Sequence, residues 1–378
     1  MYGIGRERRE RWSMRPGSSF WLRALATGLI VAAAPHPAAG QTSPPPARSY
    51  LFFVASEATD QVTLIRYGPK GALVEHRTSV KLSPDQLAAP LGLSVSPDHR
   101  FYYVIVAHGF ANGELLKVQI AADSSRRESQ PPDTVRGREP LGARPAAVRV
   151  SPDGAYAWVS NGDTAAQQSS VSVVYLPQMV EVARIPTCGM PGGSSLTADG
   201  SKHYSVCGGD DVLLEIDART MKVSRRLPLS SGNSACAPTW TEPDGIGSRI
   251  FVACNKSSEA LMIDASTWSI ARRIPMGDGV YRLALTHDGK LLIGTNQRGQ
   301  SVSIVDLATG RETARLPVKR AGPSGVAVSP DDRYAFVAET GTASDPGTVE
   351  VIDLAALKTV ATIDVGRKAG GIAFWKMQ

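Results

Sequence analysis

The sequence has few of the residues from which cofactor and metal sites are usually built. It contains four cysteines and six histidines in 378 residues, and aromatic residues make up 6%. It has no CxxCH, HExxH or GxSxG motif and no glycine-rich phosphate loop, which argues against covalent haem, a zinc protease, an α/β-hydrolase nucleophile and a nucleotide site. The histidines are also too scattered to build copper clusters. We therefore expect no cofactor and no metal.

Positive charge is scarce once the N-terminus is set aside. The formal net charge is +6, but residues 1–40 contribute +4 of it, so the rest of the chain carries about +2. This balance excludes a basic nucleic-acid-binding face. The apolar run at residues 24–34 is too short to be a permanent membrane anchor. The sequence thus predicts no nucleic-acid partner and no membrane span after signal cleavage.

Residues 1–40 have the layout of an export signal. A basic segment ends at Arg23, the apolar run follows, and Ala38-Ala39-Gly40 offers small residues for cleavage. Met14 is an alternative start, because the layout is complete from there. The residues after Arg8-Arg9 fit the twin-arginine pattern badly, which favours Sec export. We expect a periplasmic or secreted protein made of a signal peptide, a proline-rich tether and one further domain, at residues 1–40, 41–49 and 50–378.

The remaining chain contains a repeat. An aspartate in a turn of the SPDG or TADG type recurs at intervals of 55, 46, 45, 44 and 43 residues, at Asp98, Asp153, Asp199, Asp244, Asp288 and Asp331. This period is typical of the four-stranded blades of β-propellers. A second aspartate, expected to cap a turn through its side chain, ends the third strand of four units at Asp217, Asp264, Asp306 and Asp353.

The two ends of the chain are predicted to complete one more blade. Residues 50–54, 61–67 and 72–80 are predicted as second, third and fourth strands, and residues 369–375 as a first strand. Joining them gives an all-β, seven-bladed β-propeller closed by a C-terminal first strand, with Phe374 and Trp375 as structural anchors. The long first interval predicts an insertion at residues 123–140, which we expect to be a solvated loop.

Several strand motifs resemble the YVTN family of β-propeller repeats. The segments YAWVSNG, YAFVAE and IFVAC follow turns of the SPDG type and precede V-x-V-I-D segments, at residues 156–162, 334–339 and 250–254. The resemblance covers residues 50 to 378. It implies an exported or cell-surface propeller with a binding role. More distantly, similar propellers are lactonases or heavy chains of quinoprotein amine dehydrogenases.

The four cysteines occupy the same two positions in adjacent units. Cys188 and Cys236 precede a first strand, while Cys207 and Cys254 end the second strand of the same unit. These positions lie at one face of a blade, so we predict disulfides between Cys188 and Cys207 and between Cys236 and Cys254. Pairing between blades, such as Cys207 with Cys236, is the alternative. A four-thiolate metal site would show CxxC spacing, which is absent.

The loops before first strands and those between second and third strands are predicted to share one face around the channel. Their candidate ligand-binding residues are Arg144, Tyr281, Arg282, Arg320, Arg367, Lys368, His108, Glu57 and Glu339. Converging arginines favour an anionic group. We expect a non-catalytic binding or scaffold module for a protein partner or a small anionic ligand. The alternative is a lactonase-like hydrolase, with Glu57, His108 and Glu339 as acid–base candidates, or a propeller subunit of a periplasmic dehydrogenase.

Overall fold

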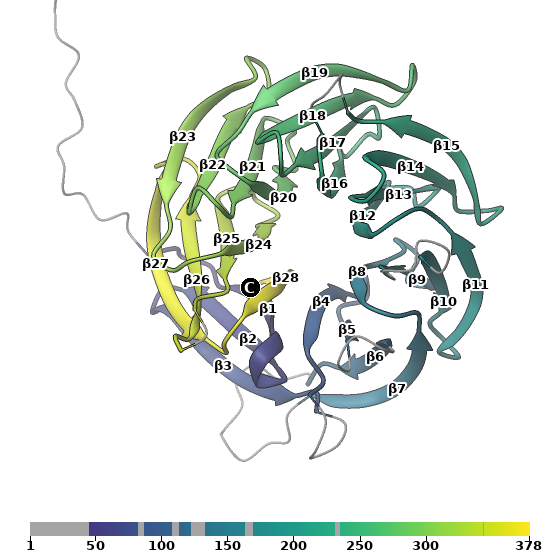
Figure 1. Ribbon diagram of the computed structural model, residues 1–378. Coiled ribbons are helices and arrows are strands. Elements are labelled where there is room, and N and C mark those ends of the chain that lie inside the picture. The colour runs from purple at the N-terminus through teal and green to yellow at the C-terminus, as the bar shows by residue number, and fades with distance from the viewer. Residues whose placement is uncertain are drawn as a thin grey trace, which may run out of the picture. The chain divides into compact units, whose positions relative to one another are not determined.

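The computed structural model describes residues 45–81, 87–107, 113–121, 133–162, 169–230, 235–342 and 344–378. Its strands form seven antiparallel sheets of four strands each. Each sheet is one blade, and the blades surround a central channel (Figure 1). The predicted seven-bladed, all-β propeller is therefore confirmed. In the described part of the chain, no helix is long and apolar enough to cross a membrane.

The first strand of each blade lies next to the channel and contacts the first strands of both neighbouring blades (Figure 1). These first strands are β4 (Pro90–Val95), β8 (Pro145–Val150), β12 (Pro191–Leu196), β16 (Pro238–Pro243), β20 (Val280–Leu285), β24 (Pro323–Val328) and β28 (Ala369–Met377). The second strands are β5 (Phe101–Val106), β9 (Tyr156–Asn161), β13 (Lys202–Cys207), β17 (Arg249–Cys254), β21 (Leu291–Asn296), β25 (Tyr334–Glu339) and β1 (Tyr50–Ser56).

The third and fourth strands lie progressively further from the channel. The third strands are β6 (Gly113–Gln119), β10 (Ser170–Tyr175), β14 (Val212–Asp217), β18 (Glu259–Asp264), β22 (Ser301–Asp306), β26 (Gly347–Asp353) and β2 (Gln61–Gly68). The fourth are β7 (Thr134–Leu141), β11 (Val180–Pro186), β15 (Lys222–Pro228), β19 (Ser269–Pro275), β23 (Arg311–Pro317), β27 (Lys358–Val365) and β3 (Gly71–Ser79). One 3-10 helix, η1 (Glu57–Thr59), joins β1 to β2.

The recurring aspartates fix the turns between strands, as predicted. Asp153 accepts a hydrogen bond from the Ala155 amide at 2.9 Å and another from the Ser151 hydroxyl. In the turn after the third strand, Asp306 accepts the Thr309 amide at 2.8 Å. Because such bonds satisfy backbone groups that the sheet leaves unpaired, each turn holds its two strands in register.

The predicted closure of the ring is confirmed, because β28 pairs with β1 in the order β28-β1-β2-β3. Phe374 lies opposite Phe52 in this ladder. Trp375 is only 4% exposed, and its indole Nε1 donates a hydrogen bond to the His99 carbonyl at 3.0 Å. The Trp375 ring also lies 5.6 Å from Phe53 of β1, and Phe374 packs 6.1 Å from Phe336 of the neighbouring blade, so both C-terminal aromatics anchor the closing strand.

Both predicted disulfides are present. Cys188 is bonded to Cys207 and Cys236 to Cys254, with Cα atoms 5.9 and 4.5 Å apart. Each bond joins the segment before a first strand to the end of the second strand of the same blade. Each of the two adjacent blades β12–β15 and β16–β19 thus has one internal crosslink, at the same end of the blade.

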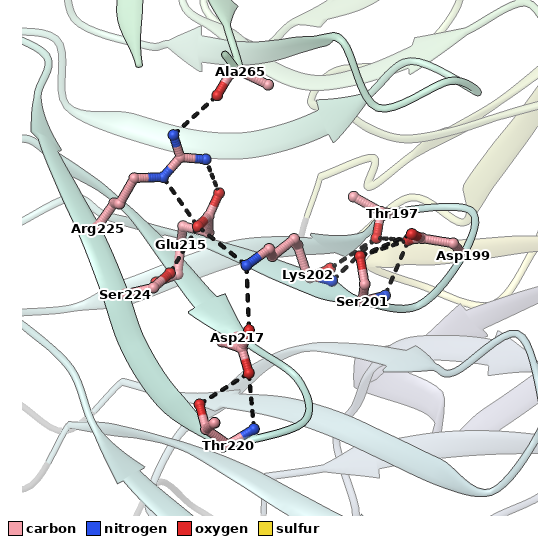
Figure 2. A network of polar contacts seen from close by, with 10 residues as sticks. All are labelled: Thr197, Asp199, Ser201, Lys202, Glu215, Asp217, Thr220, Ser224, Arg225 and Ala265. Carbon is pink, nitrogen blue, oxygen red and sulfur yellow. Dashed lines mark hydrogen bonds and ion pairs between the residues drawn. The ribbon is translucent and has the colours of Figure 1, made fainter. Parts of the chain in front are cut away.

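Polar contacts also connect these two blades (Figure 2). The buried carboxylate of Glu215 accepts hydrogen bonds from Ser224 and Arg225 and lies 3.6 Å from the Lys202 ammonium. Arg225 also donates to the Ala265 carbonyl of the next blade at 3.0 Å. The network therefore fixes a fourth strand to the neighbouring sheet.

The predicted insertion at residues 123–140 is wrong in its second half. Residues 134–141 form β7, the fourth strand of its blade, and residues 122–132 lie outside the described residues. Side chains of β7 alternate between exposed and half-buried positions. A strand with one face in solvent needs few apolar residues, so its sequence is easily mistaken for a loop.

Candidate functional site

One end of the central channel opens into a cavity of about 590 Å³, which we call the mouth. Residues that begin the first strands and residues that follow the second strands line it. Much of its wall is apolar and includes Leu91, Ala146 and Met190. Met190 is unusually exposed for an apolar residue, with 56% of its surface accessible to solvent. A cavity of this size and character suits a small molecule that has an apolar part.

Five of the nine predicted binding residues line the mouth, namely Glu57, Arg144, Tyr281, Arg282 and Lys368. The two predicted groups of loops do lie on one face. Arg320, Arg367 and Glu339 are not among the lining residues. His108 lies outside the described residues, so the structure does not place it.

Every first strand is entered through a residue with a left-handed backbone conformation. The φ angles lie between 49° and 71°, at Ala89, Arg144, Met190, Ala237, Gly279, Gly322 and Lys368. Hydrogen bonds from the opposite loop hold this conformation, which is uncommon for residues other than glycine. The Arg144 carbonyl accepts the Gly162 amide at 3.1 Å, and the Lys368 carbonyl accepts the Glu57 amide at 3.1 Å.

Two guanidinium groups lie against one indole in the channel wall. The Cζ atom of Arg282 is 4.1 Å, and that of Arg149 4.8 Å, from the ring centroid of Trp240. Arg149 Nη2 is also 3.5 Å from Glu242 Oε2, and Trp240 Nε1 donates to the same oxygen at 3.3 Å. We call these four residues the arginine–tryptophan cluster. It brings together β8, β16 and β20.

A glycine in the intervening strand, β12, explains how this cluster forms. β12 carries glycine at residue 193, and a Cβ atom there would lie 2.2 Å from Cε3 of Trp240. The indole therefore occupies space that any side chain at residue 193 would fill. As a result, Trp240 crosses one blade and reaches Ala147 and Arg149 of the next blade.

The cluster has more positive charge than its contacts neutralise. Arg282 Nε is buried and has no hydrogen-bond partner among the described residues. Burial lowers the pKa of Arg282 to about 10, so the guanidinium is still charged at neutral pH. Burial also raises the pKa of Glu242, although Arg149 and Trp240 oppose that shift. A cation with a buried and unpartnered donor favours an anionic ligand, because such a ligand restores the hydrogen bond lost to water.

Besides Arg282, the charged residues that line the mouth are Arg144, Lys368 and Glu57, which lie in the loops at its rim. The Lys368 ammonium is 3.2 Å from Glu57 Oε1, and both side chains are partly exposed. The pair joins the loop before β28 to helix η1 across the closing sheet. Because exposed ion pairs contribute little to stability, a ligand could displace this one at small cost.

Arg320 and Glu339 lie outside the mouth and stabilise the blade β24–β27. Arg320 Nε donates to the Thr348 hydroxyl at 3.2 Å, and its backbone amide donates to Glu339 Oε2 at 2.7 Å. Glu339 is fully buried, and burial together with the nearby Glu350 carboxyl raises its pKa to about 8. Its carboxyl meets the backbone of Arg320 and not the guanidinium, so the two do not form an acid–base pair across the channel.

Sequence reasoning missed Arg149, Trp240 and Glu242, although their register contains a signal. Arg149 and Glu242 each come four residues after the proline that begins a first strand. Trp240 and Arg282 share another position, which holds glycine or alanine in the other blades at residues 92, 147, 193, 325 and 371. Aligning the first strands would therefore have identified the two large side chains in adjacent blades.

No family model matches the chain, and no curated protein resembles it in sequence. Solved structures with the same fold include a periplasmic gluconolactonase of Pseudomonas aeruginosa, at 17% identity and a TM-score of 0.69, covering 87% of this chain and 99% of that one. A putative 6-phosphogluconolactonase of Bacteroides fragilis has 14% identity and a TM-score of 0.69, over 87% and 98% of the two chains.

Hydrazine synthase of Kuenenia stuttgartiensis is similar over 77% of this chain and 91% of the matched chain, with 20% identity and a TM-score of 0.61. At these identities the similarity concerns the fold alone, because one propeller frame carries many unrelated sites. The chain is a seven-bladed β-propeller, and we infer its function from the residues that line its own mouth.

Proposed function

We propose that the protein is an exported binding propeller whose mouth takes a small anionic ligand with an apolar body. The observation that carries this proposal is the half-buried Arg282 side chain, whose Nε is buried without a hydrogen-bond partner among the described residues. It lies in a cavity that is otherwise largely apolar. The anionic group would bind Arg282, and the apolar body would pack against Met190, Leu91 and Trp240.

Several observations support a location outside the cytoplasm and a place among YVTN-type repeats. The export-signal layout of residues 1–40 agrees with two disulfides, which persist in oxidising compartments. One similar structure is itself described as periplasmic. The SPDG-type turns and the strand endings that follow them support the repeat assignment. A protein partner at the mouth is less well supported, because the main unpaired donor lies inside the cavity and not at its rim.

The test is a thermal-shift screen of the mature protein against small carboxylates and phosphate monoesters, with and without an apolar substituent. We expect stabilisation by the substituted anions, at least tenfold weaker binding in Arg282→Ala, and little change in Arg320→Ala. Arg320 is the matched control because it is a partly buried arginine outside the mouth. Equal binding by the two variants would refute the proposal.

Lactone hydrolysis is the second candidate, and Glu242 is the observation that favours it. Its carboxyl group has a raised pKa and lies 3.5 Å from Arg149, so a proton-transferring group adjoins two cations that would stabilise a developing carboxylate. Turnover of gluconolactone that falls at least a hundredfold in Glu242→Gln would establish this activity. If gluconolactone is hydrolysed only at the uncatalysed rate, the hydrolase candidate is rejected and binding is the one role that remains.

A further inference from the structure

A second groove lies between two blades, away from the mouth. It encloses about 450 Å³ and is lined by Arg100, Phe101, Lys117, Arg136, Arg138 and Met179, among others; we call it the β7 groove. Arg100 stands in the turn that follows β4, whose other end, at Pro90, lines the mouth. The groove therefore opens near the opposite end of the channel-facing strand.

None of the described residues that line the β7 groove is acidic. Of three nearby carboxylates, Asp98 lies close enough to Arg100 that, although burial opposes it, this charge helps to lower the pKa of Asp98, and the other two are engaged elsewhere. Glu139 accepts the Glu181 amide of the next blade at 2.8 Å. Asp133 is buried and accepts the Ala121 amide at 2.9 Å, with His76 Nε2 at 3.1 Å. Four cationic side chains thus share one concave surface, and the counter-charge that the described part of the chain supplies near them is Asp98, beside Arg100.

The corresponding arginines of other blades show that this arrangement is unusual for the molecule. Five blades pair an arginine of their third or fourth strand with a glutamate, as Arg66–Glu75, Arg184–Glu181, Arg225–Glu215, Arg273–Glu259 and Arg315–Glu312. On β7, Arg136 has only the neutral Gln119 oxygen as acceptor among the residues that the structure describes, at 2.7 Å. No described carboxylate pairs with Arg138.

Contacts within the groove hold its cations in place and keep an apolar edge beside them. Phe101 lies under both Lys117 and Arg100, at 4.6 and 5.6 Å from the ring centroid. Lys117 also donates to the Leu176 carbonyl at 3.2 Å. Glycine at residue 137 lets Met179 approach, since a Cβ atom there would lie 2.8 Å from Cγ of Met179. Lys117 and Arg100 are therefore positioned before any ligand arrives.

We propose that the β7 groove is a second binding site, for a ligand that carries two or more phosphoryl groups. Such a ligand supplies the several negative charges that four cations require. Its oxygens match the planar donor set of the arginines. The inference does not depend on the mouth, because the two sites share no lining residue. The phosphoryl groups could belong to a soluble polyphosphate or to lipid headgroups, and the test separates the two sources.

The experiment compares Arg136→Ala/Arg138→Ala with Arg184→Ala/Arg315→Ala in the mature protein. Both double variants lose two exposed fourth-strand arginines, but only the first pair comes from the groove. Inorganic tripolyphosphate is titrated calorimetrically at two salt concentrations, and vesicles containing phosphatidylglycerol are sedimented with each protein. Thermal melts of both variants show whether the fold is kept.

We expect the groove variant to bind tripolyphosphate or the vesicles at least tenfold more weakly than the unaltered protein, and the control variant within about twofold of it. The binding should weaken as salt rises, because each phosphoryl contact releases counterions. Loss of tripolyphosphate binding alone indicates a soluble ligand, and loss of vesicle binding alone indicates headgroups. Equal binding by the two variants, or no binding by the unaltered protein, overturns the proposal.

Discussion

The blades at the closure of the ring and the blades next to the arginine–tryptophan cluster are stabilised in different ways. At the closure, aromatic rings pack across the sheets, with Phe52 4.3 Å from Phe336 and Tyr50 5.1 Å from Tyr334. In the blade β12–β15, the positions of Val326, Ala327 and Val337 of the blade β24–β27 carry buried hydroxyl groups, at Ser194, Ser195 and Ser205.

Both disulfides lie in this second region. Cys188–Cys207 adjoins Met190 and Gly208, and Cys236–Cys254 adjoins Ala237 and Asn255, all of which line the mouth. The comparison teaches that small residues make room for the site at the expense of apolar burial. The covalent bonds offset that loss. The closing blades need no crosslink because their aromatic core supplies the stability.

Removing an aromatic ring at the closure should have the largest effect. Phe336 is fully buried and contacts Tyr50, Phe52 and Phe374. We expect Phe336→Ala to lower the free energy of unfolding by about 3–5 kcal/mol, because it leaves a cavity that rigid neighbouring strands cannot fill. Denaturant titration measures the loss. A change below about 1 kcal/mol would contradict the aromatic account of the closure.

Removing a disulfide should cost somewhat less. The replacement of Cys236 and Cys254 by serine opens a crosslink between residues 18 apart in sequence, and we expect a loss of about 3 kcal/mol. Because the crosslink is remote from Phe336, the two losses should add. Melting with and without reductant, in the unaltered protein and in Phe336→Ala, checks this. Reductant that left both melting temperatures unchanged would show that the bonds add no stability.

Two buried glutamates, one in each region, should respond to pH in opposite directions. Burial alone would raise the pKa of Glu215, but bonds from Arg225 and Ser224 outweigh it, so the pKa is lowered (Figure 2). Stability from Glu215 is thus present above the ordinary carboxyl pKa and lost as pH falls. We expect Glu215→Gln to cost about 1–3 kcal/mol at pH 7, at the lower end because Arg225 is partly exposed.

Glu339 should behave in the reverse manner. Its pKa is raised from 4.5 to about 8, so the folded protein favours the neutral carboxyl. Stability should therefore fall as pH rises between those values, by at most about 1.4 kcal/mol per pH unit. Glu339→Gln should remove this slope and leave the slope from Glu215 intact. Unfolding free energies of both variants should be measured from pH 3 to pH 8, because the Glu215 slope lies below the ordinary carboxyl pKa and the Glu339 slope lies above it. A single pH profile shared by both variants would contradict this account.

The sequence alone predicts the frame of this molecule well. Turn aspartates at a nearly constant interval specify the number of blades, and Ala369–Trp375 lacks a partner unless it joins the N-terminal strands. The cysteines could be paired because they repeat at one register. Each of these inferences uses only the position of a residue within a repeated unit.

The site is predicted less well, because its chemistry depends on contacts between units. Nothing local to Trp240 reveals that glycine at residue 193, in another blade, lets the indole reach Arg149. Arg320 has the loop position of a binding residue, yet side chains on its own blade hold it away from the mouth. The β7 strand was mistaken for a loop because its exposed face carries arginines where an inner strand carries apolar residues.

The left-handed residue before each first strand has a consequence for how such a protein can change. Its backbone shape is set by hydrogen bonds between main-chain groups, so it is the same whether the side chain is methyl, thioether, guanidinium or ammonium. The five of these positions that carry a side chain can accordingly exchange it one at a time while the frame stays fixed, whereas a Cβ atom at Gly322 would lie 2.1 Å from Thr340 Oγ1. A new selectivity can then arise by single substitutions, without insertions or rebuilt loops.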